Sequence, residues 1–320
     1  MADGGGWSTI ESDEGVFTSL IENLGVKDVQ FEELISLDAD IIRSLSPVYG
    51  VIFLFKWLRE TTTTTQPTST STPPSGTYDL NPPQTLFFAN QTIQNACGTQ
   101  AILSVILNND STSPTPPNPP IPLGPALTTF KDFTTGFPPD LLGEALSNSE
   151  PIRTAHNAFA RSSPFADETI RQNQDDEGGD VYHFIAYTPV AGKLYELDGL
   201  QPHPISHGEC GREEFPEKVI EVLRERIARY PEGETRFNLM AVVRDLRVGA
   251  REIGDGEALE REERKRRAWA WENTLRRSNF VGFIGEVLKG VVGGFEEWVE
   301  RAKGETRKNL LRRGGNTDVC

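Results

Sequence analysis

Cys97 stands at a point in the sequence where a thiol can become a nucleophile. It follows the polar run 91–96 and opens a pattern at 101–106 that places apolar residues on one face of a helix. The N-terminus of a helix carries partial positive charge and free N–H groups, which favour the thiolate that attacks a carbonyl carbon. Asn95 is a candidate cap for the turn. On the local sequence alone, a buried structural cysteine is an equally good interpretation.

His183 is the histidine whose position predicts a base. If the strands on either side of residues 189–192 form a hairpin symmetric about that turn, His183 and Asp198 face each other. Directly opposed side chains have Cβ atoms roughly 5 Å apart, so the carboxylate can accept the imidazole N–H and fix its tautomer. The other ring nitrogen is then free to take a proton from Cys97. The ordinary alternative for His183 is a strand histidine with a satisfied hydrogen bond.

Gln91 supplies a candidate donor for the oxyanion that forms during acyl transfer. It lies six residues before Cys97, just past a β-rich run at 85–89. Its side-chain amide and the Cys97 backbone N–H form a possible donor pair, a role worth roughly 3 to 4 kcal/mol in other systems.

The remaining histidines are weaker candidates. His156, on a helix, is the rival base, but no acid stands at a pairing distance from it, and we expect it to pack in the interior. His203 and His207 lie in sequence rich in Pro and Gly and are expected to be solvated.

The elements that must position these residues mix helices with strands. Hydrophobic periodicity predicts helices at 140–160 and 215–230 and strands at 181–188, 193–198 and 237–243. This order predicts an α+β catalytic domain over residues 1–248. A helical extension and a basic tail are predicted over 249–320, with a charged helix at 257–277 and an apolar helical pattern at 280–299.

Three segments read as loops on the surface. Residues 61–76 consist almost entirely of Thr, Ser and Pro, and residues 111–125 are dense in Pro. Neither can bury enough apolar area to offset its ordering entropy, so both are predicted to be exposed insertions. The polar segment 161–181 is longer than most connections inside compact domains, and loops of that length are usually functional or disordered.

Composition excludes several classes of protein. The longest apolar run, 51–58, is interrupted by Lys56 and is far short of the roughly 20 residues that span a bilayer. The start of the chain has no secretory signal pattern, and three widely spaced cysteines fit neither a disulfide framework nor a zinc knuckle. We therefore expect a reducing compartment and no metal or organic cofactor.

The charge of the chain is unevenly distributed. Residues 1–250 hold 17 basic and 34 acidic side chains, and residues 251–320 hold 15 basic and 13 acidic ones. An acidic body favours a basic protein substrate over nucleic acid, because a negative surface repels phosphate. A charge that only keeps the domain soluble explains the balance equally well.

At this point the sequence resembles the ubiquitin C-terminal hydrolases, a family of papain-like cysteine peptidases. Nearly 240 residues carry the resemblance in family order, at Trp7, 10–18, 50–57, 91–100, 145–149, 152–153, 156–161, 183–184, 194–200 and 236–241. The resemblance implies a central antiparallel sheet flanked by helices. It also implies the catalytic roles argued above: Cys97 as nucleophile, His183 as base, Asp198 as the residue that orients the base, and Gln91 as oxyanion donor.

The family further implies how a substrate is held. Residues 161–181 correspond to the crossover loop, which arches over the active site and filters leaving groups by size. An early acidic and apolar segment is a candidate for ubiquitin contact, with Glu11, Ser12, Asp13, Val16 and Phe17 as its members. Glu14 departs from the pattern, because the family commonly has Pro at this position.

The C-terminal region resembles the extension of the proteasome-associated subtype. That subtype implies docking to a proteasomal ubiquitin receptor or a chromatin-remodelling subunit, in the cytoplasm and nucleus, without nucleic acid or membrane as a partner. A helix that folds back on the catalytic core is the alternative for this region. For the whole chain, the alternatives are a catalytically idle ubiquitin-binding scaffold and a hydrolase of a related ubiquitin-like modifier.

Overall fold

The structure is a computed structural model, and it describes residues 6–56, 75–160, 182–280, 282–294, 299, 300 and 303. The insertion predicted at 61–76 lies almost wholly outside these residues, and the crossover loop predicted at 161–181 lies wholly outside them.

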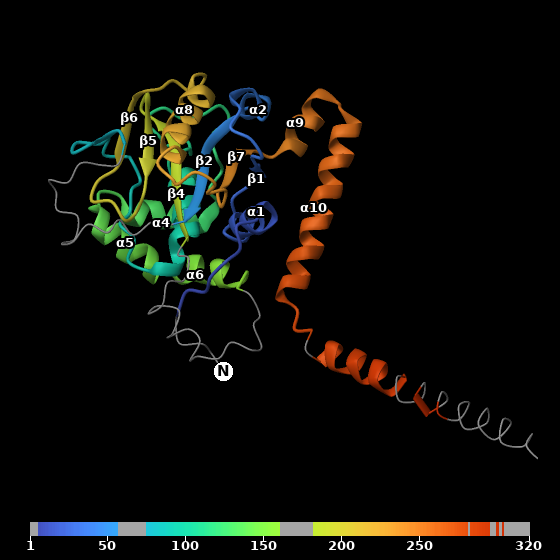
Figure 1. The fold of residues 1–320 in the computed structure, drawn as a ribbon. Helices are drawn as coiled ribbons and strands as arrows, with labels where there is room; N and C mark the ends of the chain where they lie inside the picture. The colour runs from blue at the N-terminus through green and yellow to red at the C-terminus, as the bar shows by residue number, and fades with distance from the viewer. Residues whose placement is uncertain are drawn as a thin grey trace, which may run out of the picture. The chain divides into compact units, whose positions relative to one another are not determined.

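The order of helices and strands agrees with an α+β domain (Figure 1). The helices are α1 (Glu14–Asn23), α2 (Ala39–Ser44), η1 (Gln94–Ala96), α3 (Cys97–Ile106), α4 (Gly124–Thr134), α5 (Pro139–Asn148), α6 (Glu150–Asn157), α8 (Phe215–Ile227), α9 (Leu246–Ile253) and α10 (Gly256–Arg277). The strands are β1 (Val29–Glu33), β2 (Val48–Lys56), β3 (Thr77–Tyr78), β4 (Tyr182–Val190), β5 (Lys193–Leu197), β6 (Ile205–Glu209) and β7 (Asn238–Arg244).

The strands form one antiparallel sheet in the order β1-β7-β2-β4-β5-β6-β3. Strands β2 and β4 lie at its centre, so the strand that carries His183 is paired on both sides. The predicted antiparallel sheet with flanking helices is confirmed.

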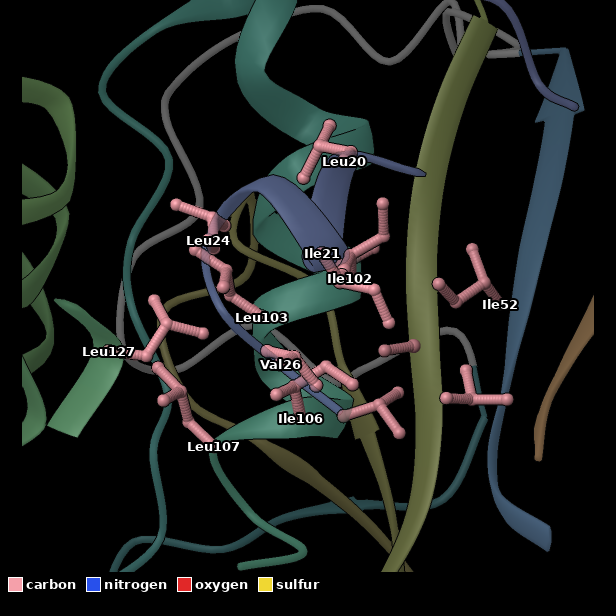
Figure 2. Close-up of a cluster of buried hydrophobic side chains, with 14 of the residues drawn as sticks. Leu20, Ile21, Leu24, Val26, Ile52, Ile102, Leu103, Ile106, Leu107 and Leu127 are labelled. Carbon is pink, nitrogen blue, oxygen red and sulfur yellow. The ribbon is translucent and has the colours of Figure 1, made fainter. Parts of the chain in front are cut away.

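Two hydrophobic clusters cover the two faces of the sheet. Figure 2 shows Ile52 of β2 pointing toward the buried apolar side chains of α1 and α3 on one face. Val51 and Phe53 point the other way, into the cluster that includes α8. Alternate side chains of a strand point to opposite faces, so a strand covered on both sides reads as a continuous apolar run, as 51–55 does.

The helix α10 packs on the catalytic unit through one aromatic anchor. Trp269 is 6% exposed, and its indole Nε1 donates a hydrogen bond of 3.2 Å to Glu14 of α1. A Cβ atom placed on Gly15 would lie 2.6 Å from the Trp269 ring, so the close approach requires glycine here. Glu14, which departs from the family pattern, therefore contacts α10 and also accepts a hydrogen bond from the Glu33 backbone N–H.

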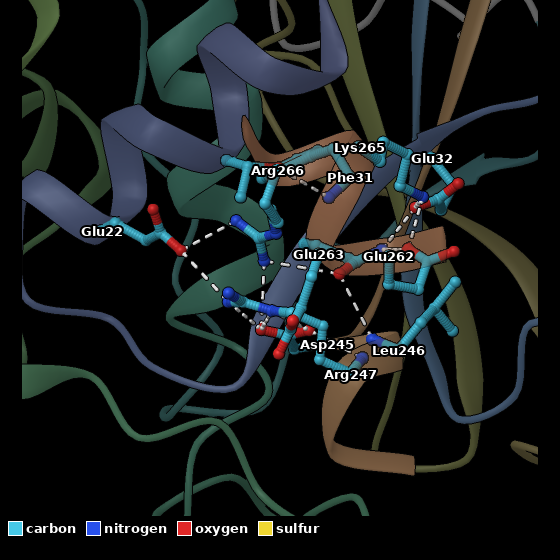
Figure 3. A network of polar contacts seen from close by, with 12 residues as sticks. Glu22, Phe31, Glu32, Asp245, Leu246, Arg247, Glu262, Glu263, Lys265 and Arg266 are labelled. Carbon is cyan, nitrogen blue, oxygen red and sulfur yellow. Dashed lines mark hydrogen bonds and ion pairs between the residues drawn. The ribbon is translucent and has the colours of Figure 1, made fainter. Parts of the chain in front are cut away.

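A polar network joins α10 to the elements beside it (Figure 3). Arg266 pairs with Asp245 at 3.1 Å and with Glu22 at 2.8 Å, while Lys265 pairs with Glu32 of β1 at 2.5 Å. The helix α10, up to Arg277, belongs to the same compact unit as the sheet, and these interactions hold it there. The domain boundary at 248 stays a prediction. The described residues from Ser278 onward belong to a second unit, in which 282–294 are helical.

The segment 111–125 differs in part from the predicted exposed loop. Ile121 and Leu123 are 2% and 6% exposed and belong to the core, and the helix α4 already begins at Gly124. Arg212 donates to the carbonyl oxygen of Thr115 at 2.7 Å, which ties the loop to the sheet side of the domain. The prediction missed these contacts because it rested on the high proline content and gave no weight to Ile121 and Leu123.

Candidate active site

Cys97 is the first residue of α3, as predicted. The helix is otherwise buried over Gly98–Ile106, whereas Cys97 is partly exposed. A Cβ atom on Gly98 would lie 3.5 Å from the Phe184 ring, so the start of α3 packs against the strand that carries His183. Asn95 does not cap the helix; its side chain donates instead to the Trp7 carbonyl oxygen at 3.0 Å.

The run 85–89 before Cys97 is not a strand, contrary to prediction. Side-chain amides of α3 and the turn that follows it take the place of a partner strand. Asn108 bonds both to the Phe87 N–H at 2.8 Å and to the Phe87 carbonyl oxygen at 2.9 Å, and Gln100 donates to the Ala89 carbonyl oxygen. A β-rich composition does not distinguish these two ways of satisfying the backbone.

His183 and Asp198 form a buried pair, as predicted. His183 Nε2 donates to Asp198 Oδ1 at 2.7 Å, and the side chains are 4% and 1% exposed. The same Asp198 oxygen accepts the Leu200 N–H at 3.0 Å, which orients the carboxylate.

The predicted hairpin register is wrong by two residues. Val190 pairs with Lys193 and Ala186 with Leu197, so the turn is Ala191-Gly192 and Asp198 lies past the end of β5. His183 therefore meets Asp198 diagonally. An error of two residues keeps a side chain on the same face of the sheet, whereas an error of one would have turned it away.

The electrostatics of His183 suit a proton carrier. Burial alone lowers the pKa of His183, but the Asp198 carboxylate and a hydrogen bond and charge interaction with Cys97 raise it to about 9. The imidazole therefore holds a proton at neutral pH and faces both the Asp198 carboxylate and the Cys97 sulfur. Since Nε2 is bonded to Asp198, Nδ1 is the nitrogen left for Cys97.

Gln91 is tied to the loop that carries Asp198. Its backbone N–H donates to the Gly199 carbonyl oxygen at 2.8 Å. A Cβ atom on Gly199 would lie 3.0 Å from the Gln91 backbone nitrogen, so glycine allows the two segments to approach. The segment before Cys97 and the residue after Asp198 are thus held together.

The candidate substrate segment separates into three environments. Val16 and Phe17 are 1% and 0% exposed, so they belong to the core and cannot meet a protein substrate at the surface. They are buried because they lie on the face of α1 that packs against the sheet. The ring centroids of Phe17 and Phe184 are 5.8 Å apart. Ser12 donates to Asn238 at 2.9 Å.

The two acidic residues of that segment are engaged by α10. Arg276 donates to Glu11 at 3.0 Å and to Asp13 at 2.7 Å. Asp13 also caps α1 by accepting the Val16 N–H at 2.9 Å. Their contact with ubiquitin stays a prediction.

The other histidines behave differently from one another. His156 packs in the interior as predicted, with its ring nitrogens 2.7 Å from the Thr99 hydroxyl and 2.5 Å from the Ser8 carbonyl oxygen, and burial lowers its pKa. The solvated position predicted for His207 is wrong, because its side chain is 4% exposed and lies 3.0 Å from Glu196. His203 is partly exposed, with its ring 5.9 Å from that of Tyr78.

Metal binding and membrane insertion find no support in the described residues. No group of three or more His, Cys, Asp or Glu side chains in this part of the chain is arranged to hold a metal ion. No helix within the same described ranges is long and apolar enough to cross a membrane.

Comparison with known proteins identifies the family. The sequence model described as "Ubiquitin carboxyl-terminal hydrolase, family 1" matches residues 7–228. This chain is a member of that family. A second model, described as "Ubiquitin carboxyl-terminal hydrolases", matches residues 256–292, which include α10 and most of the following helix.

Similar ubiquitin carboxyl-terminal hydrolases cover most of the chain. Ubiquitin carboxyl-terminal hydrolase 2 of Schizosaccharomyces pombe is 49% identical over 292 residues, which cover 89% of this chain and 91% of that protein. Ubiquitin carboxyl-terminal hydrolase ubh-4 of Caenorhabditis elegans is 37% identical over 311 residues, which cover 90% of this chain and 88% of that protein. The crystal structure of Trichinella spiralis UCH37 bound to ubiquitin vinyl methyl ester superposes with a TM-score of 0.61 at 33% identity, covering 85% of this chain and 100% of that chain. The chain is thus a ubiquitin hydrolase of the subtype with a C-terminal extension.

Proposed function

We propose that this ubiquitin hydrolase cleaves bonds to the C-terminal glycine of ubiquitin through Cys97, His183 and Asp198, with Gln91 as an oxyanion donor. The observation that carries the proposal is the position of His183. Its ring is bonded to Asp198 on one side and to the thiol at the start of α3 on the other.

The geometry supports a two-step acyl transfer. The Cys97 thiolate attacks the glycine carbonyl carbon, and the negative charge that forms on the carbonyl oxygen is met by the Cys97 N–H and the Gln91 amide. The His183 imidazolium then protonates the leaving amine as the thioester forms. Water hydrolyses the thioester with His183 as base, and Asp198 holds the imidazole in one tautomer throughout.

The substrate follows from the relatives. The UCH37 structure holds a ubiquitin derivative, which supports ubiquitin over a related modifier for this chain. Such a site would cleave isopeptide bonds to the ubiquitin C-terminus and the bonds that join small adducts to it.

The proposal includes docking through the C-terminal helix. Residues 282–294 present a series of exposed apolar side chains: Phe283, Ile284, Val287, Leu288, Val291 and Val292. Each is 46–69% exposed, and contiguous apolar surface of this kind is typical of an interaction site. The proposed partner is a proteasomal ubiquitin receptor or a chromatin-remodelling subunit, in the cytoplasm and nucleus.

The experiment is hydrolysis of a ubiquitin C-terminal fluorogenic amide as a function of pH. The unchanged protein is expected to turn over and to lose activity as the pH rises through about 9, where His183 gives up the proton that the leaving amine needs. Asp198→Asn removes the charge that raises the pKa of His183, so its alkaline limb should move to lower pH. Cys97→Ala should have no turnover while still binding ubiquitin. Turnover that survives Cys97→Ala would refute the triad, and binding without turnover in the unchanged protein would favour the scaffold.

A further inference from the structure

A second buried group of charges lies directly behind the catalytic pair. Glu196 precedes Asp198 by two residues and is 2% exposed. Side chains two residues apart along an extended chain point to the same side, so two carboxylates share this part of the interior. The carboxylate of Glu196 is held by Tyr187 at 3.0 Å, His207 at 3.0 Å and Arg226.

Arg226 is the one permanently charged cation among the groups that hold Glu196. It comes from α8 and is 9% exposed. Burial raises the pKa of Glu196, as does the charge of Asp198, yet Arg226 and His207 bring it below its ordinary value. Burial likewise raises the pKa of Asp198, whereas His183, the Leu200 N–H and Arg226 bring it below its usual range.

The guanidinium of Arg226 also contacts the aromatic ring that packs against the catalytic base. Its Cζ lies 4.6 Å from the centroid of Phe55. Phe55 is the directly opposed partner of His183 in the β2–β4 register, and the two rings meet edge to face with centroids 5.7 Å apart. One cation thus contacts the aromatic side chain that packs against the imidazole and also balances the carboxylates beside it.

We infer that Arg226 is a positioning residue of the hydrolase, which allows Glu196 and Asp198 to be ionised together and keeps Phe55 packed against His183. This role rests on the triad of the proposed function. It assigns Arg226 no contact with substrate. The requirement is electrostatic. The His183 imidazolium pairs with Asp198, and Glu196, a second buried carboxylate two residues away, needs a cation of its own to stay ionised beside that pair.

Several titratable groups face this site. They are His183 and Tyr187 of β4, Glu196 of β5 and Asp198 just after it, His207 of β6, and Tyr230 in the turn that follows α8. Arg226 is charged over the whole experimental range, so a pH profile separates its charge from the titration of its neighbours.

The test compares the acidic limbs of two pH profiles among variants of the full chain. The first profile is kcat/KM as a function of pH with a ubiquitin C-terminal fluorogenic amide. The second is the rate at which iodoacetamide alkylates Cys97, read by mass spectrometry of its peptide. Circular dichroism establishes which variants fold. The second profile needs no turnover, so it still reports on Arg226 if the proposed function fails.

Arg226→Met is expected to move the acidic limb to higher pH by about one unit, because Asp198 keeps His183 but loses the second cation that favours its ionised form. It should also lower kcat/KM at neutral pH on the order of tenfold, within the range for members of one hydrogen-bonded network. Arg226→Lys keeps the charge and should leave the limb near its original position. Arg224→Met, on the same helix but exposed, is the matched control and should change neither profile.

Two further variants decide between charge and packing. Arg226→Met combined with Glu196→Gln leaves no unpaired buried charge and should bring the limb back toward the unchanged protein. Glu196→Gln alone should move it to lower pH, since Asp198 then has Arg226 without a competing carboxylate. If Arg226→Met does not fold, Glu196→Gln decides. Any of three results would overturn the inference. Arg226→Met could fold and keep the acidic limb at its original pH, or the double variant could be shifted as far as Arg226→Met alone. The acidic limb of Glu196→Gln could also stay in place or move to higher pH.

Discussion

Two consecutive helices of the C-terminal region differ in composition and in the side chains that they expose. The helix α10 is dominated by charged residues, yet it packs on the catalytic unit and buries Trp269, Glu262 and Asn273. The helix at 282–294 is far more apolar, yet side chains such as Phe283 and Val291 are 69% and 63% exposed. A few ion pairs and one buried ring hold the charged helix α10, while exposed apolar side chains such as those of 282–294 are typical of an interaction site.

The largest effect on the docked helix should come from its aromatic anchor. Trp269→Ala removes the side chain that fills the space over Gly15, and we expect the free energy of unfolding to fall by about 3 to 5 kcal/mol. Trp271→Ala is the matched control, because Trp271 lies two residues further on and is 65% exposed. Urea unfolding should show a change within about 0.5 kcal/mol for the control. Equal effects of the two substitutions would refute the anchor.

A smaller effect should come from the polar network. Burial raises the pKa of Asp245, but hydrogen bonds from Arg247 and the charge of Arg266 bring it below its ordinary value. A depressed carboxyl pKa contributes stability that is present above the ordinary value near 3.8 and is lost as the pH falls through the folded-state value.

Asp245→Asn should therefore lower the free energy of unfolding at pH 7 by about 2 kcal/mol, with the difference shrinking in acid. Urea unfolding of both proteins between pH 3 and 7 measures it, with the exposed Asp132→Asn as control. A difference that does not change with pH would mean that packing, not charge, is responsible.

The smallest effect on stability should come from the exposed helix. Leu288→Asp changes a side chain that is 57% exposed, so the free energy of unfolding should change by less than about 0.5 kcal/mol. Binding to a proteasomal ubiquitin receptor, measured by calorimetry, should be lost. The adjacent Lys289→Ala should keep it. Unaltered binding by Leu288→Asp would remove this face from the proposed interface.

The sequence predicted the pairing of His183 with Asp198 better than it predicted the strand register that brings them together. The order of strands around His183 and Asp198 follows from local periodicity, and their pairing survived a register error because the error kept the side chains on one face. The exact register depends on a two-residue turn at Ala191-Gly192, which the pattern of apolar residues does not specify.

Long-range contacts account for what the sequence did not reveal. Val16 and Phe17 read as substrate contacts from the family motif, but only the packed structure shows that they fill the core. Arg226 lies 28 residues after Asp198 in a helix rich in charges, and nothing in its neighbourhood distinguishes it from the exposed Arg224. Glu196 offered a signal, since an acid two residues before the triad acid in a buried strand needs a cation.

The most direct test of the account is where a ubiquitin C-terminal electrophile reacts on the full chain. Ubiquitin vinyl methyl ester should form one covalent adduct, and peptide mapping should place it on Cys97. His183→Ala should slow its formation strongly, because the thiolate loses its imidazolium partner. No adduct, or an adduct on Cys210 at the same rate in a Cys97→Ala protein, would contradict the assignment of Cys97 as the nucleophile.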